Sequence, residues 1–241
     1  IPATATAGDD ETYPVVGIGD SVFAGTAGDG AHANTTLESV KLGANIEFIG
    51  GRAFRYCTGL TTVDFSEATK LERIGNNAFY DAKSVTAWDL SACTALTTVE
   101  DSAFLYGFGK TTTLRLPGSI TSWGKNVIAS PSVAVYAAKE SGTFKTLTEV
   151  LKNNNDSFIL ALENGNLAYQ YVYKNGVPSI TIVGFASGVT DDQKKTVDIP
   201  DDIDGVPVTA VATYAFSNKG NDNYKQIKRV TIGKNVSQIG N

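Results

Sequence analysis

Leu60–Phe104 reads LTTVDFSEATKLERIGNNAFYDAKSVTAWDLSACTALTTVEDSAF, and one phrase occurs in it twice. The run I-G-N-N-A-F at 74–79 returns as V-E-D-S-A-F at 99–104, a shift of 25 residues (74 to 99). A shorter pattern, T-T-V-D-F at 61–65, alternates with it. An internal repeat of this length indicates a stacked architecture, because one unit alone is too small to bury its apolar face.

Two apolar patterns alternate along residues 37–128. The first, L-x-x-V-x-L, predicts a short strand with one buried face; its copies begin at Leu37, Leu60, Val85 and Thr111. The second, L-x-x-I-G-x-x-A-F, has copies that begin at Ile46, Leu71, Leu96 and Ile120. Stacking gives such strands a continuous core. The sequence therefore predicts an α/β leucine-rich-repeat solenoid, a strand-rich right-handed coil with short parallel strands and few short helices.

Two positions of the second pattern have structural interpretations. The glycine after the isoleucine permits a turn that a β-carbon obstructs, and a positive φ is one possible reason. The following Ala-Phe pair sets a small residue beside a large one. Its equivalent place in every unit favours a buried aromatic column over the alternative, an exposed binding stripe. The expected column comprises Phe23, Phe54, Phe79, Phe104 and Phe216.

The composition is that of an ordinary globular protein. Of the 241 residues, 42% are hydrophobic and 19% are charged, and the formal net charge is −5. This balance implies no broad basic surface for nucleic acid, and no apolar run approaches the roughly 20 residues that span a bilayer. Cys57 and Cys93 precede different patterns, so we expect them buried at different corners of the coil, too far apart for a disulfide.

The repeats are interrupted after residue 138. Helically spaced apolar residues predict a capping helix over residues 139–153; they are Phe144, Leu147, Val150 and Leu151. Alternating runs on both sides of the Asn-Gly pair at 175–176 predict a β-hairpin. Repeat copies return from Val208. We therefore expect two domains, residues 1–156 and 157–241, and a natural protein that continues beyond Asn241.

Three phrases resemble one class of leucine-rich repeat, the BspA-like class. They are I-G-N-N-A-F at 74–79, V-D-I-P-D-D-I-D-G-V-P-V-T-A-V-A-T-Y-A-F at 197–216 and V-T-I-G-K-N-V-S-Q-I-G at 230–240. The resemblance covers most of residues 13–138 and 157–241, although Glu100 and Ala212 replace the glycine. It implies a bacterial protein that is secreted or anchored at the cell surface. Some members of this class act as adhesins for host proteins.

The sequence shows no motif of an enzyme, cofactor or metal site. It contains no G-x-S-x-G, H-E-x-x-H, phosphate loop or C-x-x-C, and its single histidine, His32, has no partner at ligand spacing. Acidic residues between Asp191 and Asp204 lack the spacing of a calcium loop and are interpreted as a solvated turn. We therefore expect a non-enzymatic chain without cofactor or metal.

The first pattern carries a row of charges at its outward positions. The residue before the last apolar position is Lys41, Asp64, Asp89 and Arg115 in successive units. Stacked parallel strands bring equivalent positions to about 4.8 Å, so these side chains are expected to be neighbours on one face. One interpretation is a solvated ladder that prevents wrong stacking, since exposed ion pairs contribute little energy. The other is part of a partner-binding surface.

Three functions are compatible with these features. The first is an adhesin-like interaction scaffold, extracellular or at the cell surface, that binds a protein or glycan through the solenoid face. The second is a structural spacer that displays other domains. The third, with the least support, is a polysaccharide-active enzyme with two facing carboxylates. For each, we expect no nucleic-acid partner and no membrane insertion, and we expect that any signal or anchor has been removed from this chain.

Overall fold

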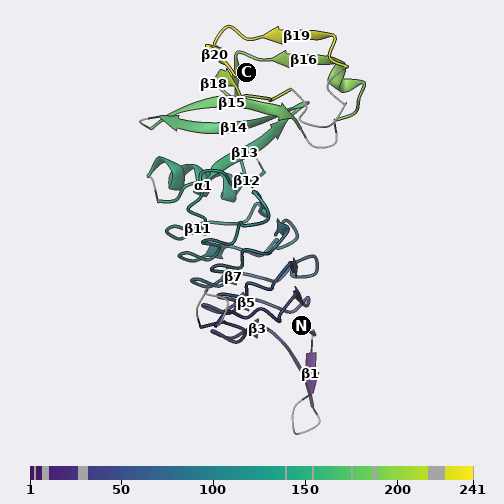
Figure 1. The fold of residues 1–241 in the computed structure, drawn as a ribbon, viewed down its shortest axis with the longest axis vertical. Coiled ribbons are helices and arrows are strands. Elements are labelled where there is room, and N and C mark those ends of the chain that lie inside the picture. Colours follow the sequence, from purple (N-terminus) through teal and green to yellow (C-terminus); the bar gives the residue numbers. More distant parts are fainter. Residues whose placement is uncertain are drawn as a thin grey trace. The chain divides into compact units, whose positions relative to one another are not determined.

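The computed structural model describes residues 1–2, 4–6, 11–26, 32–138, 140–153, 155–174, 176–186, 189–216 and 226–240 (Figure 1). The chain divides into two compact units, Ile1–Phe158 and Ile159–Asn241. Both units are rich in strands, as the sequence predicts. Over the described residues, no helix has the length and apolarity that a membrane span requires.

The second pattern forms one parallel sheet along the first unit, and Figure 1 shows its turns stacked in chain order. In this sheet Ile18 pairs with Ile49, Ile49 with Ile74, and Ile74 with Val99. The last two pairs show that the 25-residue shift of the sequence is the register of the coil. Its strands are β3 (Gly17–Ile18), β5 (Phe48–Ile49), β7 (Arg73–Ile74), β9 (Thr98–Val99) and β11 (Ser122–Trp123).

The first pattern forms two parallel ladders on another side of the coil. Strand β4 pairs with β6, and β8 pairs with β10, which pairs with β12. The ladder is interrupted between β6 and β8, which belong to separate sheets. These strands are β4 (Ser39–Lys41), β6 (Thr62–Asp64), β8 (Trp88–Asp89), β10 (Thr113–Arg115) and β12 (Ala134–Tyr136). Near the chain start, β1 (Thr4–Thr6) pairs with β2 (Thr12–Pro14) in antiparallel orientation.

An aromatic column runs through the core of the first unit. The rings of Phe23, Phe54, Phe79 and Phe104 stack in order, with centroids 5.2, 5.1 and 5.4 Å apart. All but Phe23 are fully buried, so the column is core rather than a binding stripe. The prediction was wrong for Phe216, which belongs to the second unit, where its ring contacts Phe185 at 5.1 Å.

The glycines of the second pattern are required by a close approach between turns. A β-carbon on Gly75 would lie 2.7 Å from the backbone nitrogen of Gly51, and one on Gly124 would lie 2.4 Å from that of Asp101. The suggested positive φ is not found at these glycines. It occurs two positions later, at the residue before the alanine of each Ala-Phe pair or its equivalent. The first-unit residues at this place are Ser21, Arg52, Asn77, Ser102 and Asn126.

The capping helix forms as predicted, with a shorter range. Helix α1 spans Gly142–Lys152, because the Ser141 hydroxyl accepts a hydrogen bond from the Phe144 N–H at 3.1 Å and caps the helix there. Thr143 fastens the helix to the last turn: its hydroxyl accepts from the Ile120 N–H at 2.9 Å. Thr143 is fully buried, together with Leu147.

The second unit opens with three antiparallel strands, β13 (Ile159–Asn164), β14 (Leu167–Lys174) and β15 (Val177–Phe185). The predicted hairpin is β14–β15, and its Gly176 has a φ of 77°. Repeats then return earlier than the sequence indicated, because Thr196–Ile199 (β16) pairs in parallel with Arg229–Ile232 (β19). The remaining elements are η1 (Gln193–Lys195), β17 (Asp202–Ile203), β18 (Val206–Val211) and β20 (Gln238–Ile239).

Candidate partner-binding surface

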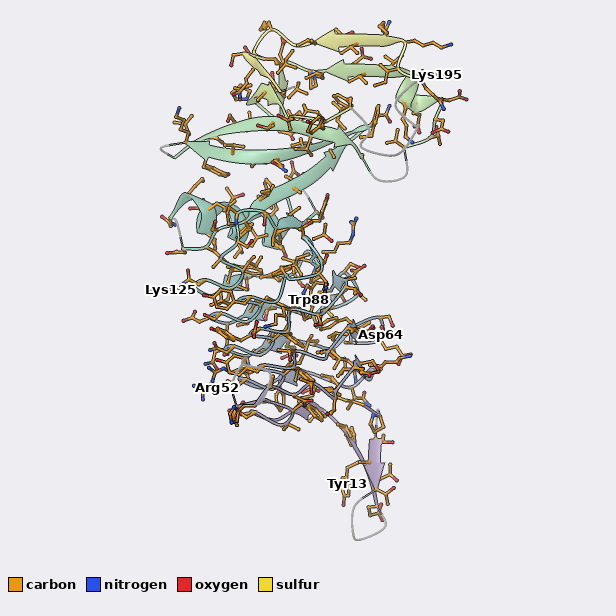
Figure 2. The ribbon with its side chains drawn as sticks, in the orientation of Figure 1. Tyr13, Arg52, Asp64, Trp88, Lys125 and Lys195 are labelled. Carbon is orange, nitrogen blue, oxygen red and sulfur yellow. The ribbon has the colours of Figure 1, made fainter. Side chains whose placement is uncertain are left out.

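The structure places the four charged positions in two register pairs. Lys41 lies opposite Asp64 in the β4–β6 ladder, and Asp89 lies opposite Arg115 in the β8–β10 ladder. Within the first unit, Figure 2 shows Asp64 on the opposite side of the coil from Arg52 and Lys125. The charges therefore lie on the strand face of the first pattern, and the interruption of the ladder separates the two pairs.

Both cations of this row are engaged by other groups. The Lys41 ammonium lies 2.8 Å from the Glu67 carboxylate, whose hydrogen bond and charge raise the pKa of Lys41 above its ordinary value. The Arg115 guanidinium lies over the ring of Tyr136, 4.7 Å from its centroid, which is a cation–π contact. The two aspartates lie on the strands that border the interruption.

The interruption is visible in one missing backbone hydrogen bond. In an intact ladder, the N–H of the residue that follows one strand donates to the carbonyl of the last residue of the next strand. This bond runs from the Leu42 N–H to the Asp64 carbonyl at 3.0 Å and from the Leu90 N–H to the Arg115 carbonyl at 2.9 Å. Its equivalent would join the Phe65 N–H to the Asp89 carbonyl. That bond is not formed in this fully described part of the solenoid. Both groups therefore face the gap.

Trp88 is the residue that distinguishes this turn. It occupies the position that Val63 and Leu114 hold in the neighbouring turns, and it is buried. Its ring lies 5.0 Å from that of Phe79 and 4.9 Å from that of Phe104, and its Nε1–H donates to the Gly107 carbonyl at 3.0 Å. An indole is much larger than a valine, so we attribute the separation of β8 from β6 to its volume.

A pocket of about 310 Å³ fills the gap between β6 and β8. We call it the ladder pocket. Its volume is at the lower end of the range for small-ligand sites, which suits one side chain or one sugar ring. Its lining combines two carboxylates, four hydroxyls and a few apolar groups: Thr62, Val63, Asp64, Phe65, Ser66, Thr86, Ala87, Asp89, Ser91 and Ala92.

The carboxylates of the ladder pocket are held in the same way. Asp64 Oδ1 accepts a hydrogen bond from the Ser66 N–H at 2.9 Å, and Asp89 Oδ1 accepts from the Ser91 N–H at 3.0 Å and the Ser91 hydroxyl at 2.6 Å. Hydrogen bonds from Ser66 hold the pKa of the Asp64 carboxyl below its ordinary value. Both bonds at Asp89 use Oδ1, so Oδ2 of Asp89 remains to accept from a ligand.

Sequence reasoning found the aspartates of this site but not their setting. The missed signal is D-x-S, which occurs as D-F-S at 64–66 and D-L-S at 89–91, where the neighbouring turns have K-L-G and R-L-P. An aspartate two residues before a serine favours this local turn. The second missed signal was Trp88, which stands at a position where the neighbouring turns have Val63 and Leu114.

A row of tyrosines lies at another corner of the first unit. The rings of Tyr56 and Tyr80, and of Tyr80 and Tyr106, meet edge to face with centroids 5.4 Å apart. The Arg55 guanidinium lies 4.5 Å from the centroid of the Tyr56 ring. Tyr106 is 62% exposed. Tyrosine and arginine are residue types enriched at protein interfaces.

The other candidates from the sequence have structural explanations. Asp191 pairs with Lys194 at 3.1 Å, and Asp201 pairs with Lys234 at 3.0 Å, as expected of solvated turns. Among the described residues, no three His, Cys, Asp or Glu side chains gather closely enough to hold a metal ion. Cys57 and Cys93 are both free and buried.

The fold and its strand face define a leucine-rich-repeat solenoid. The BspA type leucine rich repeat region matches residues 18–147 in 6 copies, and the chain belongs to this family. A search of curated proteins found no sequence match.

Several solved structures are similar to the chain. A leucine-rich repeat protein from Bacteroides ovatus is 15% identical, with a TM-score of 0.46, over 100% of this chain and 47% of that one. A leucine rich cell surface protein from Faecalibacterium prausnitzii is 21% identical, with a TM-score of 0.33, over 100% and 64%. A leucine-rich repeat protein from T. pallidum is 22% identical, with a TM-score of 0.42, over 51% and 52%. The chain thus spans about half the length of two of these proteins.

Proposed function

We propose that this chain is a non-enzymatic interaction scaffold of a bacterial cell surface, which binds an extracellular protein or glycan through the strand face of its first unit. Membership of the BspA type family supports the general class, as does the cell surface protein among the similar structures. Solenoids provide long surfaces for such contacts, although a fold alone does not define a function.

The observation that carries this proposal is the ladder pocket. A structural spacer needs only a closed strand ladder, in which each turn satisfies the backbone of the next. Here the ladder opens between β6 and β8, and Asp64 and Asp89 line the opening. Lys41 and Arg115 lie one strand further out on either side. All four residues therefore form the proposed surface. The tyrosine row, which is exposed at Tyr106, gives the same unit a second feature typical of binding proteins.

The test is a binding screen against extracellular-matrix proteins and a glycan array. We expect saturable binding of micromolar or tighter affinity, which is lost in the variant Asp64→Lys/Asp89→Lys. The matched control is Glu47→Lys/Glu72→Lys, because these exposed residues occupy consecutive turns of the second pattern, where the Glu72 N–H donates to the Glu47 carbonyl at 2.7 Å. It makes the same change in charge on another side of the coil and should leave binding intact.

Two results would contradict the proposal. Equal loss of binding in both double variants would show a general charge effect rather than a site at the ladder pocket. A negative result in both screens would favour the spacer, the second candidate function. Circular dichroism of each variant checks that it is folded.

A further inference from the structure

We propose that the ladder pocket binds the side chain of an arginine from an extended segment of a protein partner. This inference rests on the proposed function and names the chemistry of the partner at the same site. Three features of the pocket select this occupant: its volume, its charge and its unpaired backbone groups.

The first feature is size and shape. The ladder pocket lies between β6 and β8. Just before these strands, the Thr86 N–H donates to the Thr61 carbonyl at 3.0 Å, and the two chain segments separate beyond this bond. Its volume of about 310 Å³ accepts one long side chain and excludes a folded element. The apolar lining, which includes Val63 and Ala87, suits the methylene stem of an arginine.

The second feature is charge. Asp64 and Asp89 both line the ladder pocket, and the Ser91 N–H and hydroxyl both donate to Oδ1 of Asp89, which leaves its Oδ2 as an acceptor. The cations of the row have other partners as well: Lys41 pairs with Glu67 while its charge also acts on Asp64, and Arg115 stacks on Tyr136. A planar guanidinium with several N–H donors matches carboxylates better than an ammonium does, and it is less strongly hydrated.

The third feature is the open backbone. The interruption leaves the Phe65 N–H and the Asp89 carbonyl facing the gap. In the neighbouring turns, the equivalent N–H and carbonyl groups form a hydrogen bond with each other. A buried or partly buried backbone group needs a partner. The Asp89 carbonyl can accept one of the guanidinium N–H groups, and the Phe65 N–H can donate to a backbone carbonyl of the bound segment. These groups favour a peptide over a free cation.

The experiment is an NMR titration of the whole ¹⁵N-labelled chain with a short probe, acetyl-Gly-Arg-Gly-amide. We expect saturable shifts of the Ser66, Ser91 and Phe65 amides at millimolar probe, as befits a single side chain. The same peptide with citrulline, which is a neutral isostere of arginine, should shift these amides at least tenfold less. A lysine peptide should bind more weakly than the arginine peptide.

The variant for this test is Asp64→Asn/Asp89→Asn. Asparagine keeps an Oδ1 that accepts the serine N–H, so the local turns persist while the charge is lost. We expect the affinity for the arginine peptide to fall at least tenfold, and Glu47→Gln/Glu72→Gln to bind like the unchanged protein. Because hydrogen bonds from Ser66 hold the pKa of Asp64 below its ordinary value of about 3.9, binding should be constant above that pH and weaken only as a lower pH protonates Asp64.

Equal shifts with the citrulline peptide, or shifts spread over the surface in both double variants, would overturn the inference. So would the absence of any shift at these three amides. The proposed function is tested separately. If a glycan or protein binds in the screen and this binding is lost on charge reversal, the scaffold function is supported even where the arginine peptide does not bind. The two proposals therefore have distinguishable outcomes.

Discussion

Gly75 is a residue at which two turns of the solenoid come too close for any side chain. A β-carbon there would lie 2.7 Å from the nitrogen of Gly51 and 2.8 Å from the carbonyl carbon of Gly50, and backbone atoms cannot move aside cheaply. We expect Gly75→Ala to lower the free energy of unfolding by about 2–4 kcal/mol, measured by urea denaturation. The loss comes from separation of the two turns, which weakens their stacking.

The control for this prediction lies in the turn before. A β-carbon on Gly51 would meet the side-chain oxygen of Asn76 at 2.5 Å, and that amide can rotate away. Gly51→Ala should therefore change the free energy of unfolding by less than about 1 kcal/mol. If both substitutions cost the same, the close approach of the backbones at Gly75 is not what limits the residue type.

The glycine pattern shows what a sequence predicts at this scale. The obstruction of a β-carbon was predicted from the repeated I-G, and the structure shows the obstruction. Its physical cause was not accessible, because the obstructing atoms of Gly50 and Gly51 lie a whole turn away in sequence. The residues with positive φ are serine, arginine or asparagine from turn to turn, as in Arg52 and Asn77, so no single residue type marks the position.

At the scale of elements, Asp156 closes the end of the first array. It is 8% exposed, and its carboxylate accepts hydrogen bonds from Trp123 Nε1 at 3.0 Å and from the N–H groups of Ala129 at 2.7 Å and Ser157 at 2.8 Å. The Ile128 N–H adds a fourth donor at 3.1 Å. This side chain supplies acceptors to backbone groups that have no further turn to pair with.

We expect Asp156→Ala to destabilise the protein by about 3 kcal/mol, because buried donors lose their acceptor. Asp156→Asn keeps one acceptor oxygen and should lose less. Thermal unfolding followed by circular dichroism gives the comparison. An alanine variant as stable as the original protein would show that solvent replaces the carboxylate and that Asp156 is not a cap.

The elements were predicted to different degrees. Helix α1 followed from the spacing of Phe144, Leu147 and Val150, and the hairpin followed from its Asn-Gly turn. The break between β6 and β8 was not predicted, because periodicity treats Trp88 as one more apolar residue in the first pattern. The volume of the indole, to which we attribute the break, enters only with its packing against Phe79 and Phe104.

At the scale of the whole molecule, the two cysteines report on the integrity of the first unit. Cys57 and Cys93 are buried in different turns, and burial raises the pKa of each thiol to about 12, with the charge of Asp89 adding to the effect at Cys93. The reactive thiolate is therefore scarce in the folded protein and forms near the ordinary pKa of about 8.5 after unfolding.

We expect neither thiol to react with a disulfide reagent at pH 8 until urea unfolds the unit, and both to react over the same range of urea. Turns of a solenoid depend on their neighbours, which couples the two sites. Mass spectrometry of the labelled peptides distinguishes them. Rapid labelling of Cys93 alone in the absence of urea would mean that the turn beside the ladder pocket opens independently.

The stacked organisation of the molecule could be predicted from the sequence because the same repeat pattern occurs many times. Each copy gives the same register, so an error in one turn is corrected by the others. The candidate site was accessible only as a row of charges at Lys41, Asp64, Asp89 and Arg115. A binding site in a repeat protein is a local departure from the repeat, and a single departure such as Trp88 has no second copy to support it.

Amide hydrogen exchange at Phe65 tests the central claim most directly, because the proposed binding surface exists only if the strand ladder is open there. The amides of Leu42, Leu90 and Leu116 donate to the next strand, at 3.0, 2.9 and 3.0 Å. By NMR we expect these three to be protected, and the Phe65 amide to exchange at least a hundredfold faster than they do. Protection of Phe65 equal to theirs would mean that β6 and β8 pair in solution, which would contradict both the ladder pocket and the function proposed for it.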